Sequence, residues 1–130
     1  MRLRSITAAL VAVAAAAQAS GATPASMASL APTRVGQCMQ TTVREVGTRL
    51  ENTPGSGSAI AYADGVSQVS YDQVPGIDAS RRGDPVKLCL VSLPRNCPLG
   101  DDRGKVYRAT NLRTGRTWTA PDSEHSCGGA

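Results

Sequence analysis

Short runs rich in Val, Thr, Tyr and Leu alternate with Gly, Pro, Asp and Asn from Gln37 onward, at intervals of about ten residues. This spacing is typical of strands joined by tight turns. We therefore predict an all-β fold, mainly antiparallel. Its form would be a small disulfide-stapled β-barrel or sandwich of about five or six strands, because both architectures limit exposed strand edges. Residues 37–130 are predicted to form this single β domain.

The clearest local signal is a β-hairpin with strands at residues 58–63 and 66–72. Asp64-Gly65 between them is favoured in a two-residue turn, because that turn needs positive φ at both central residues. The resulting register places Ile60 opposite Val69. Four side chains then share one side of the hairpin and are predicted to form a wall of the core: Ile60, Tyr62, Val69 and Tyr71.

Two further segments have strand-like patterns. Residues 41–51 predict a strand with a bulge or bend, although Val43, Val46 and Leu50 also fit the spacing of a short helix. Residues 86–93 are apolar on both faces and predict a central strand.

Residues 105–110 and 116–120 predict a second hairpin, in which Gly115 would take a left-handed conformation that closes the loop. Five cations fall on or beside this hairpin: Arg103, Lys105, Arg108, Arg113 and Arg116. If Arg108 and Arg116 project from one face near Trp118 or Tyr107, this group forms a cationic and aromatic surface for an anionic partner. The alternative is that the arginine stems cover an exposed sheet face while the charged ends stay in water.

The N-terminus has the pattern of a secretory signal peptide. A short basic start is followed by an apolar run over residues 6–17 and by the small-residue triplet Ala17-Gln18-Ala19. The run is shorter than the roughly 20 residues that span a bilayer, so we expect no transmembrane anchor. We predict that residues 1–19 are a signal peptide cleaved after Ala19 and that the mature protein is periplasmic or secreted. The alternatives are cleavage after Ala22 and a retained apolar helix.

Residues 20–36 consist mainly of Ala, Ser, Pro, Thr and Gly, and this composition predicts a flexible leader. The chain has three Tyr, one Trp and no Phe, so its core must consist mostly of Val, Leu, Ile and Ala. A core of this kind is modest, and covalent cross-links are expected to stabilise it.

The four cysteines are predicted to form two disulfides in an oxidising compartment: Cys38, Cys89, Cys97 and Cys127. We favour Cys89 with Cys97, because the short segment between them can turn the chain back, and Cys38 with Cys127, which would join the ends of the domain. The alternative pairing is Cys38 with Cys89 and Cys97 with Cys127. A zinc site is disfavoured because the chain has no Cys-x-x-Cys pair.

His125 is the single histidine of the chain. With Asp122, Asp101 or Asp102 it could serve a small secreted hydrolase or a metal-dependent enzyme. Neighbours alone do not assemble a catalytic triad, however, and the Asp101-Asp102 pair fits a turn between strands. We therefore expect neither a cofactor nor a metal site. Arg82-Gly83-Asp84 matches an integrin-binding tripeptide, but a turn before a strand explains it adequately.

Without its signal peptide the chain would carry 12 Lys plus Arg against 10 Asp plus Glu, a net charge of +2. This small excess argues against nucleic acid as a partner. We predict an exported binding domain of the bacterial cell envelope that uses the Arg-rich hairpin to recognise an anionic polymer or an envelope protein. The alternative is the secreted enzyme centred on His125.

Overall fold

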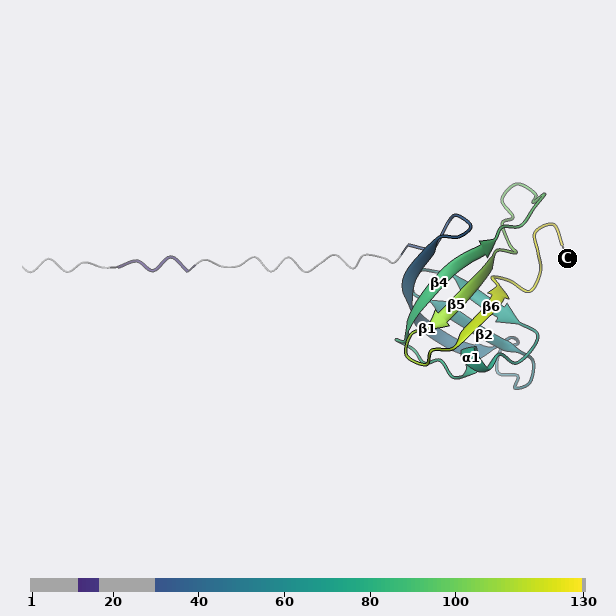
Figure 1. Ribbon diagram of the computed structural model, residues 1–130, viewed down its shortest axis with the longest axis horizontal. Helices are drawn as coiled ribbons and strands as arrows, with labels where there is room; N and C mark the ends of the chain where they lie inside the picture. The colour runs from purple at the N-terminus through teal and green to yellow at the C-terminus, as the bar shows by residue number, and fades with distance from the viewer. Residues whose placement is uncertain (1–11, 17–29, 130) are drawn as a thin grey trace, which may run out of the picture.

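The computed structural model describes residues 12–16 and 30–129, and the second range contains six strands and one short helix (Figure 1). In chain order the elements are β1 (Cys38–Thr48), β2 (Ser58–Tyr62), β3 (Ser67–Ser70), α1 (Pro75–Asp78), β4 (Pro85–Ser92), β5 (Val106–Asn111) and β6 (Thr117–Pro121). Neighbouring strands all pair antiparallel, in the order β3-β2-β1-β4-β5-β6. The prediction of a small all-β fold is therefore confirmed.

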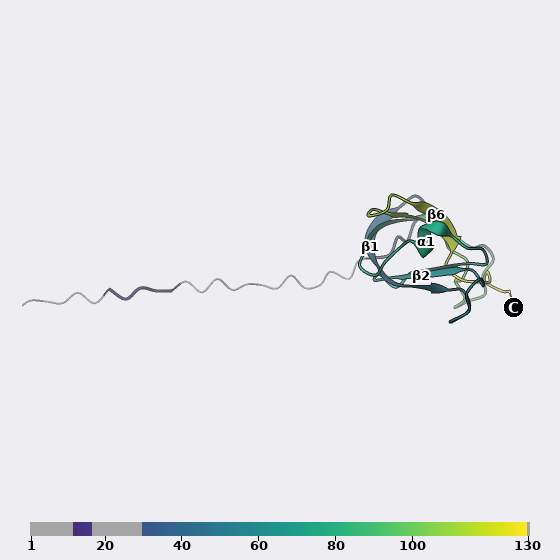
Figure 2. The ribbon, with the colours of Figure 1, turned by 90° about the horizontal axis from the view of Figure 1, so that it is seen from below.

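β1 is the longest strand, and it makes the sheet curl. Its first half, residues 38–42, pairs with β4, and its second half, residues 43–48, pairs with β2. A bulge between Val43 and Glu45 separates the two halves, and a bulge bends a strand and increases its twist. The sheet consequently wraps into a half-barrel around one interior (Figure 2). The prediction of a bent strand in this part of the chain is confirmed.

The interior of the half-barrel is filled mainly by aliphatic side chains, as the composition predicts. Three of the four aromatic residues join them. The cluster consists of Val43, Ile60, Tyr62, Ile77, Val86, Leu88, Leu90, Tyr107, Ala109 and Trp118. Ile77 enters from α1, and the preceding Gly76 lies against the indole: a Cβ at this position would be 2.6 Å from Cε3 of Trp118. Glycine therefore lets α1 approach β6 closely.

The first hairpin differs from its predicted register by one residue. Ile60 pairs with Gln68 and not with Val69. The reason lies in the loop: the Tyr62 N–H donates to the Val66 carbonyl (2.9 Å), so three residues connect the strands where two were predicted. A shift of one residue turns each side chain of the return strand to the opposite face of the sheet.

Gln68 therefore lies opposite Ile60 and faces the core, at the position that was predicted for Val69. Ile60 and Tyr62 line the core as predicted. Val69 is only partly buried and Tyr71 is exposed, so the predicted core wall is wrong for these two residues.

The buried side chain of Gln68 makes four hydrogen bonds. Its Oε1 accepts from the Tyr62 hydroxyl (2.6 Å) and from Nε1–H of Trp118 (3.0 Å). Its Nε2 donates to the backbone carbonyls of Tyr107 (2.8 Å) and Ala120 (3.0 Å). Because β3 and β6 are the two edges of the sheet, this side chain links them across the open side of the half-barrel.

The other strand predictions agree with the structure. β4 lies between β1 and β5, as expected of a central strand. β5 and β6 form the second hairpin, and Gly115 in its loop has a φ of 73°. A left-handed glycine therefore closes this loop as predicted.

Two disulfides are present, and their pairing corrects the favoured prediction. Cys38 is bonded to Cys89 and Cys97 to Cys127, so the favoured pairing is wrong and the alternative is confirmed. The reason is the neighbourhood of β1 and β4, which places Cys38 directly opposite Cys89 with their Cα atoms 4.0 Å apart. The second bond ties the loop after β4 to the C-terminal segment, with a Cα–Cα distance of 5.2 Å.

The described residues just before Gln37 pack against the β domain. Pro32 is buried, and the Gly36 N–H donates to the Leu90 carbonyl (2.9 Å). Residues 12–16 are exposed and lie outside helices and strands. The rest of the predicted signal peptide, its cleavage point and the leader up to residue 29 lie outside the described residues. In the described ranges, no helix has the length and hydrophobicity needed to span a membrane.

We predict that Gln68→Ala lowers the free energy of unfolding by about 3–5 kcal/mol, because it leaves a buried hydroxyl, an indole N–H and two carbonyls short of a partner. Denaturant unfolding measures the change. Gln73→Ala, at an exposed glutamine, is the matched control and should change stability by about 0.5 kcal/mol or less. Equal effects of the two substitutions would contradict the role assigned to Gln68.

Candidate anion-binding site

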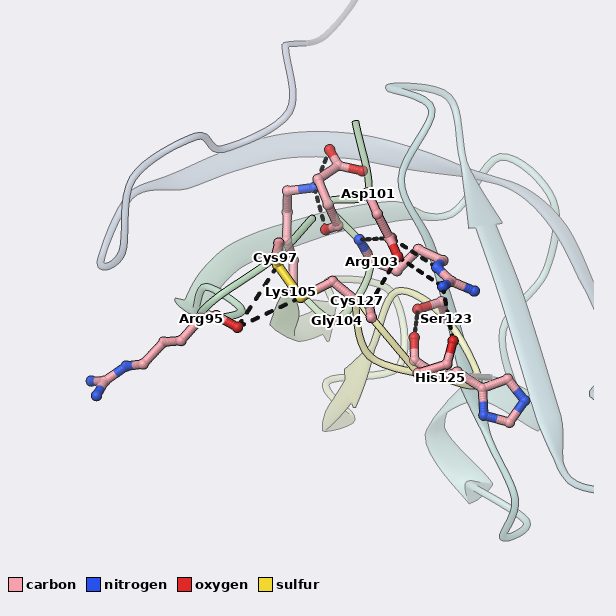
Figure 3. The surroundings of a disulfide bond; sticks show 12 residues. Arg95, Cys97, Asp101, Arg103, Gly104, Lys105, Ser123, His125 and Cys127 are labelled. Carbon is pink, nitrogen blue, oxygen red and sulfur yellow. Dashed lines mark hydrogen bonds and ion pairs between the residues drawn. A yellow bond between two sulfur atoms is a disulfide. The ribbon is translucent and has the colours of Figure 1, made fainter. Parts of the chain in front are cut away.

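Two of the cations predicted to form a binding surface are paired with carboxylates beside the second disulfide. Nε and Nη2 of Arg103 each lie 2.9 Å from an oxygen of Asp101 (Figure 3). Nζ of Lys105 lies 2.7 Å from Oδ2 of Asp102. The guanidinium lowers the pKa of Asp101 and the ammonium lowers the pKa of Asp102. Both cations are therefore largely neutralised by their neighbours.

A third predicted cation, Arg113, is paired with a buried carboxylate. Its Nε lies 2.7 Å from Oδ1 of Asp84, and its Nη2 lies 3.0 Å from Oδ2. Nδ2 of Asn111 also donates to Oδ2 (2.9 Å). The hydrogen bond from the Arg113 guanidinium is the main cause that holds the pKa of Asp84 well below its ordinary value. Arg113 thus stabilises the fold and is not free to bind a partner.

The aromatic residues predicted for the same surface are buried. Trp118 is 6% exposed and Tyr107 is 3% exposed. Arg108 and Arg116 are exposed, and neither has an ion pair within residues 30–129. The structure therefore does not place these arginines beside an exposed aromatic ring, and the hairpin carries no cationic and aromatic surface.

Positive charge gathers elsewhere, in a shallow hollow between β1 and the loop before β4. Three exposed arginines line this arginine hollow: Arg44, Arg81 and Arg82. Glu45, Val46 and Ser80 complete its lining. None of the three guanidinium groups has an ion pair among the residues that the structure describes. The hollow therefore presents three unpaired cations to solvent.

The backbone on both sides of the arginine hollow is held in place. Arg44 lies at the bulge that follows Val43 in β1. Opposite, the loop forms a turn in which the Asp84 N–H donates to the Arg81 carbonyl (3.0 Å), and Gly83 has a φ of 90°. Oδ2 of Asp84 accepts from the Arg81 N–H (2.8 Å), and the Gly83 N–H donates to the Val43 carbonyl (2.8 Å). The paired Asp84 carboxylate thus fixes the turn that carries two of the three arginines.

Only part of this site could be recognised in the sequence. The adjacent pair Arg81-Arg82 before a glycine is a visible signal, but nothing in the sequence links it to Arg44, which reaches the hollow only because β1 lies beside this loop. The tripeptide that begins at Arg82 is a turn, as expected. Its aspartate, Asp84, is only 6% exposed and engaged by Arg113, so it is not presented for adhesion.

His125 is exposed, and its imidazole makes no hydrogen bond to the described residues; Figure 3 shows the ring turned away from the disulfide. The Ser123 hydroxyl donates to the backbone carbonyl of His125 (2.6 Å), not to its ring. Oδ1 of Asp122 accepts from the Gly104 N–H (2.8 Å). The described chain therefore assembles no acid–base set around this histidine. Nor do its His, Cys, Asp and Glu side chains form any group of three or more that could hold a metal ion.

No family model, curated protein or solved structure matches this chain. The chemistry of the described residues is therefore the basis for a function, and its most distinct feature is the arginine hollow.

We predict that Asp84→Asn lowers the free energy of unfolding by about 2–4 kcal/mol at pH 7, because Arg113 loses its partner. The pKa of Asp84 is lower in the folded than in the unfolded chain, so the carboxylate stabilises the fold above about pH 4 and this stabilisation is lost as the pH falls further. The difference between wild type and variant should therefore shrink in acid.

Unfolding in urea at several pH values measures this difference. Asp72→Asn, at an exposed aspartate that forms no ion pair within the described ranges, is the control and should follow wild type throughout. A difference for Asp84→Asn that stays constant from neutral to acid pH would contradict the role of the ionised carboxylate.

Proposed function

We propose that the protein is an exported binding domain of the bacterial cell envelope that recognises an anionic partner through the arginine hollow. The partner class is an anionic envelope polymer or an acidic envelope protein. The observation that carries the proposal is the contrast between paired and unpaired cations. Arg49, Arg103, Lys105 and Arg113 each have a carboxylate within ion-pair distance, whereas the three arginines of the hollow have none in the described chain.

Three guanidinium groups and one carboxylate, that of Glu45, line the hollow, so it has an excess of positive charge that a bound anion would balance. Guanidinium groups also suit phosphate and carboxylate ligands, because their planar N–H donors can bind two oxygens at once. The backbone that carries them is fixed by the bulge at Arg44 and by the turn at Arg81. A ligand would therefore need to order mainly the arginine side chains, which limits the entropic cost of binding.

Export is supported by the sequence pattern and by the cysteines. The basic start and apolar run are typical of a signal peptide. The two disulfides fit an oxidising compartment, because such bonds are rare in proteins of the cytosol.

We predict that the purified protein binds polyphosphate, used as a model anionic polymer, and that Arg81→Ala combined with Arg82→Ala weakens binding about tenfold or more. The reason is the loss of two guanidinium groups from the hollow. Titration at low and at moderate salt measures the affinity, which should fall with salt because bound counterions are released.

Arg108→Ala combined with Arg116→Ala is the charge-matched control, since it also removes two exposed arginines. This variant should retain most of the affinity. A larger loss of affinity in the control than in the hollow variant would instead place the anion site on the second hairpin. Equal small losses in both variants would exclude a localised anion site.

We also predict that protein recovered from its native cells begins at Ser20, because cleavage after Ala19 removes the signal peptide. Mass spectrometry of the N-terminal peptide tests this. Recovery of the chain with Met1 or residues 6–17 still attached would contradict export by this route.

A further inference from the structure

A second recess, distinct from the arginine hollow, lies at the other end of the half-barrel. It has a volume of about 410 Å³, within the usual range for small-molecule pockets. Its lining comes from segments far apart in the sequence: residues 31–33, residues 64–67 at the entry to β3, Leu90 of β4, Lys105 just before β5, Tyr107 of β5, and Asp122 after β6. We call it the mouth pocket.

The hydroxyl of Tyr107 in this pocket has no partner. The residue is only 3% exposed, yet its hydroxyl makes no hydrogen bond to any described residue. Burial, and then the negative charges of Asp122 and Asp64, raise the pKa of Tyr107 to about 12. The hydroxyl is therefore protonated at neutral pH, in a pocket whose lining includes both carboxylates. Tyr62, by contrast, donates its hydroxyl to Gln68 at 2.6 Å.

Asp64 brings a second unmatched polar atom to the same pocket. Its Oδ1 accepts from the Val66 N–H (2.9 Å), but its Oδ2 is buried without a hydrogen-bond partner in the described chain. Burial raises the pKa of this carboxyl, the direction expected when a charge lacks compensation. Buried polar groups in proteins are nearly always paired, so the unpaired Oδ2 of Asp64 requires an explanation, and the Tyr107 hydroxyl is a second group in this pocket without a partner among the described residues.

The charges around the mouth pocket favour a cation. Asp64 and Asp122 line it, and Lys105 is the opposing charge in its lining. Nζ of Lys105 is directed to Asp102, at 2.7 Å, and lies 3.9 Å from Asp122. The ammonium is thus paired with a carboxylate outside the lining, and the two carboxylates of the lining outnumber it. An anionic ligand would therefore meet net repulsion at this site.

We propose that the mouth pocket binds a small organic cation: a primary ammonium group attached to a compact apolar body. The Tyr107 hydroxyl oxygen would accept a hydrogen bond from the ammonium, and Asp64 and Asp122 would balance its charge. The apolar body would contact Pro32, Val66 and Leu90, which supply the nonpolar part of the lining. This site is independent of the arginine hollow and takes a ligand of the opposite charge.

The test compares three probes of similar size: benzylamine, benzyl alcohol and benzoate. Each is titrated into the purified protein while amide signals of residues 31–33 and 64–67 are followed by NMR. We expect benzylamine to shift these signals, benzyl alcohol to bind about tenfold more weakly because it lacks the charge, and benzoate not to bind. Equal affinity for all three, or no shift with benzylamine, would overturn the proposal.

Two tyrosine variants provide a matched pair, since each loses one buried hydroxyl. Tyr107→Phe removes the unpaired hydroxyl, so it should leave stability nearly unchanged and weaken benzylamine binding about tenfold. Tyr62→Phe removes the hydroxyl bound to Gln68, so it should lower stability and leave benzylamine affinity unchanged. The reverse pattern would overturn the assignment of the Tyr107 hydroxyl as a ligand contact.

Asp64→Asn keeps the shape of the side chain and removes its charge, and it should weaken benzylamine binding without affecting benzyl alcohol. The variant that lacks Arg81 and Arg82 should bind benzylamine like wild type. The two proposals are tested separately, because a protein that does not bind benzylamine can still bind polyphosphate.

Discussion

The side chain of Gln68 holds together a sheet that its own backbone pairing leaves open. β3 and β6 are the edges of the sheet, and no strand lies between them. One buried amide makes four hydrogen bonds: those with Trp118 and Ala120 connect β3 to β6, and those with Tyr62 and Tyr107 connect it to β2 and β5. Trp118 in turn supports α1 through its contact with Gly76. Tyr107, whose carbonyl accepts one of these bonds, carries its ring toward the mouth pocket, so the same amide positions the wall of that pocket.

An ion pair with one buried member, the Asp84 carboxylate, has a comparable role at the other end of the half-barrel. Asp84 and Arg113 join the turn before β4 to the loop of the second hairpin. The same carboxylate holds the Arg81 amide, so the pair also orients the arginine hollow. The cations among the described residues therefore fall into two groups: those paired with carboxylates, and those left unpaired on the surface. Charge counted along the sequence cannot separate these groups, because Arg49 and Arg113 pair with carboxylates from other elements, although Arg103 and Lys105 pair within their own loop.

The strands could be predicted because their signals are local: alternating β-branched residues, turn residues and a left-handed glycine at position 115. The register of the first hairpin could not, because Asp64-Gly65 fits both a two-residue turn and the three-residue loop that forms. A polar residue such as Gln68 also gives no sign that it will be buried, since only the carbonyls of β5 and β6 make its burial favourable. The disulfide pairing, the arginine hollow and the mouth pocket all depend on which strands lie side by side, and that order is set by the whole sheet.

The pairing of the cysteines also has a consequence for the order of folding. Cys38 bonds to Cys89 and Cys97 to Cys127, so the two cross-linked loops follow one another along the chain and do not overlap. A chain that enters an oxidising compartment from its N-terminus delivers the first pair complete before either member of the second arrives. Each cysteine can then bond at once to its final partner, without exchange through a mixed disulfide. A bond between the first and last cysteines would instead have to wait until the chain had entered that compartment as far as Cys127.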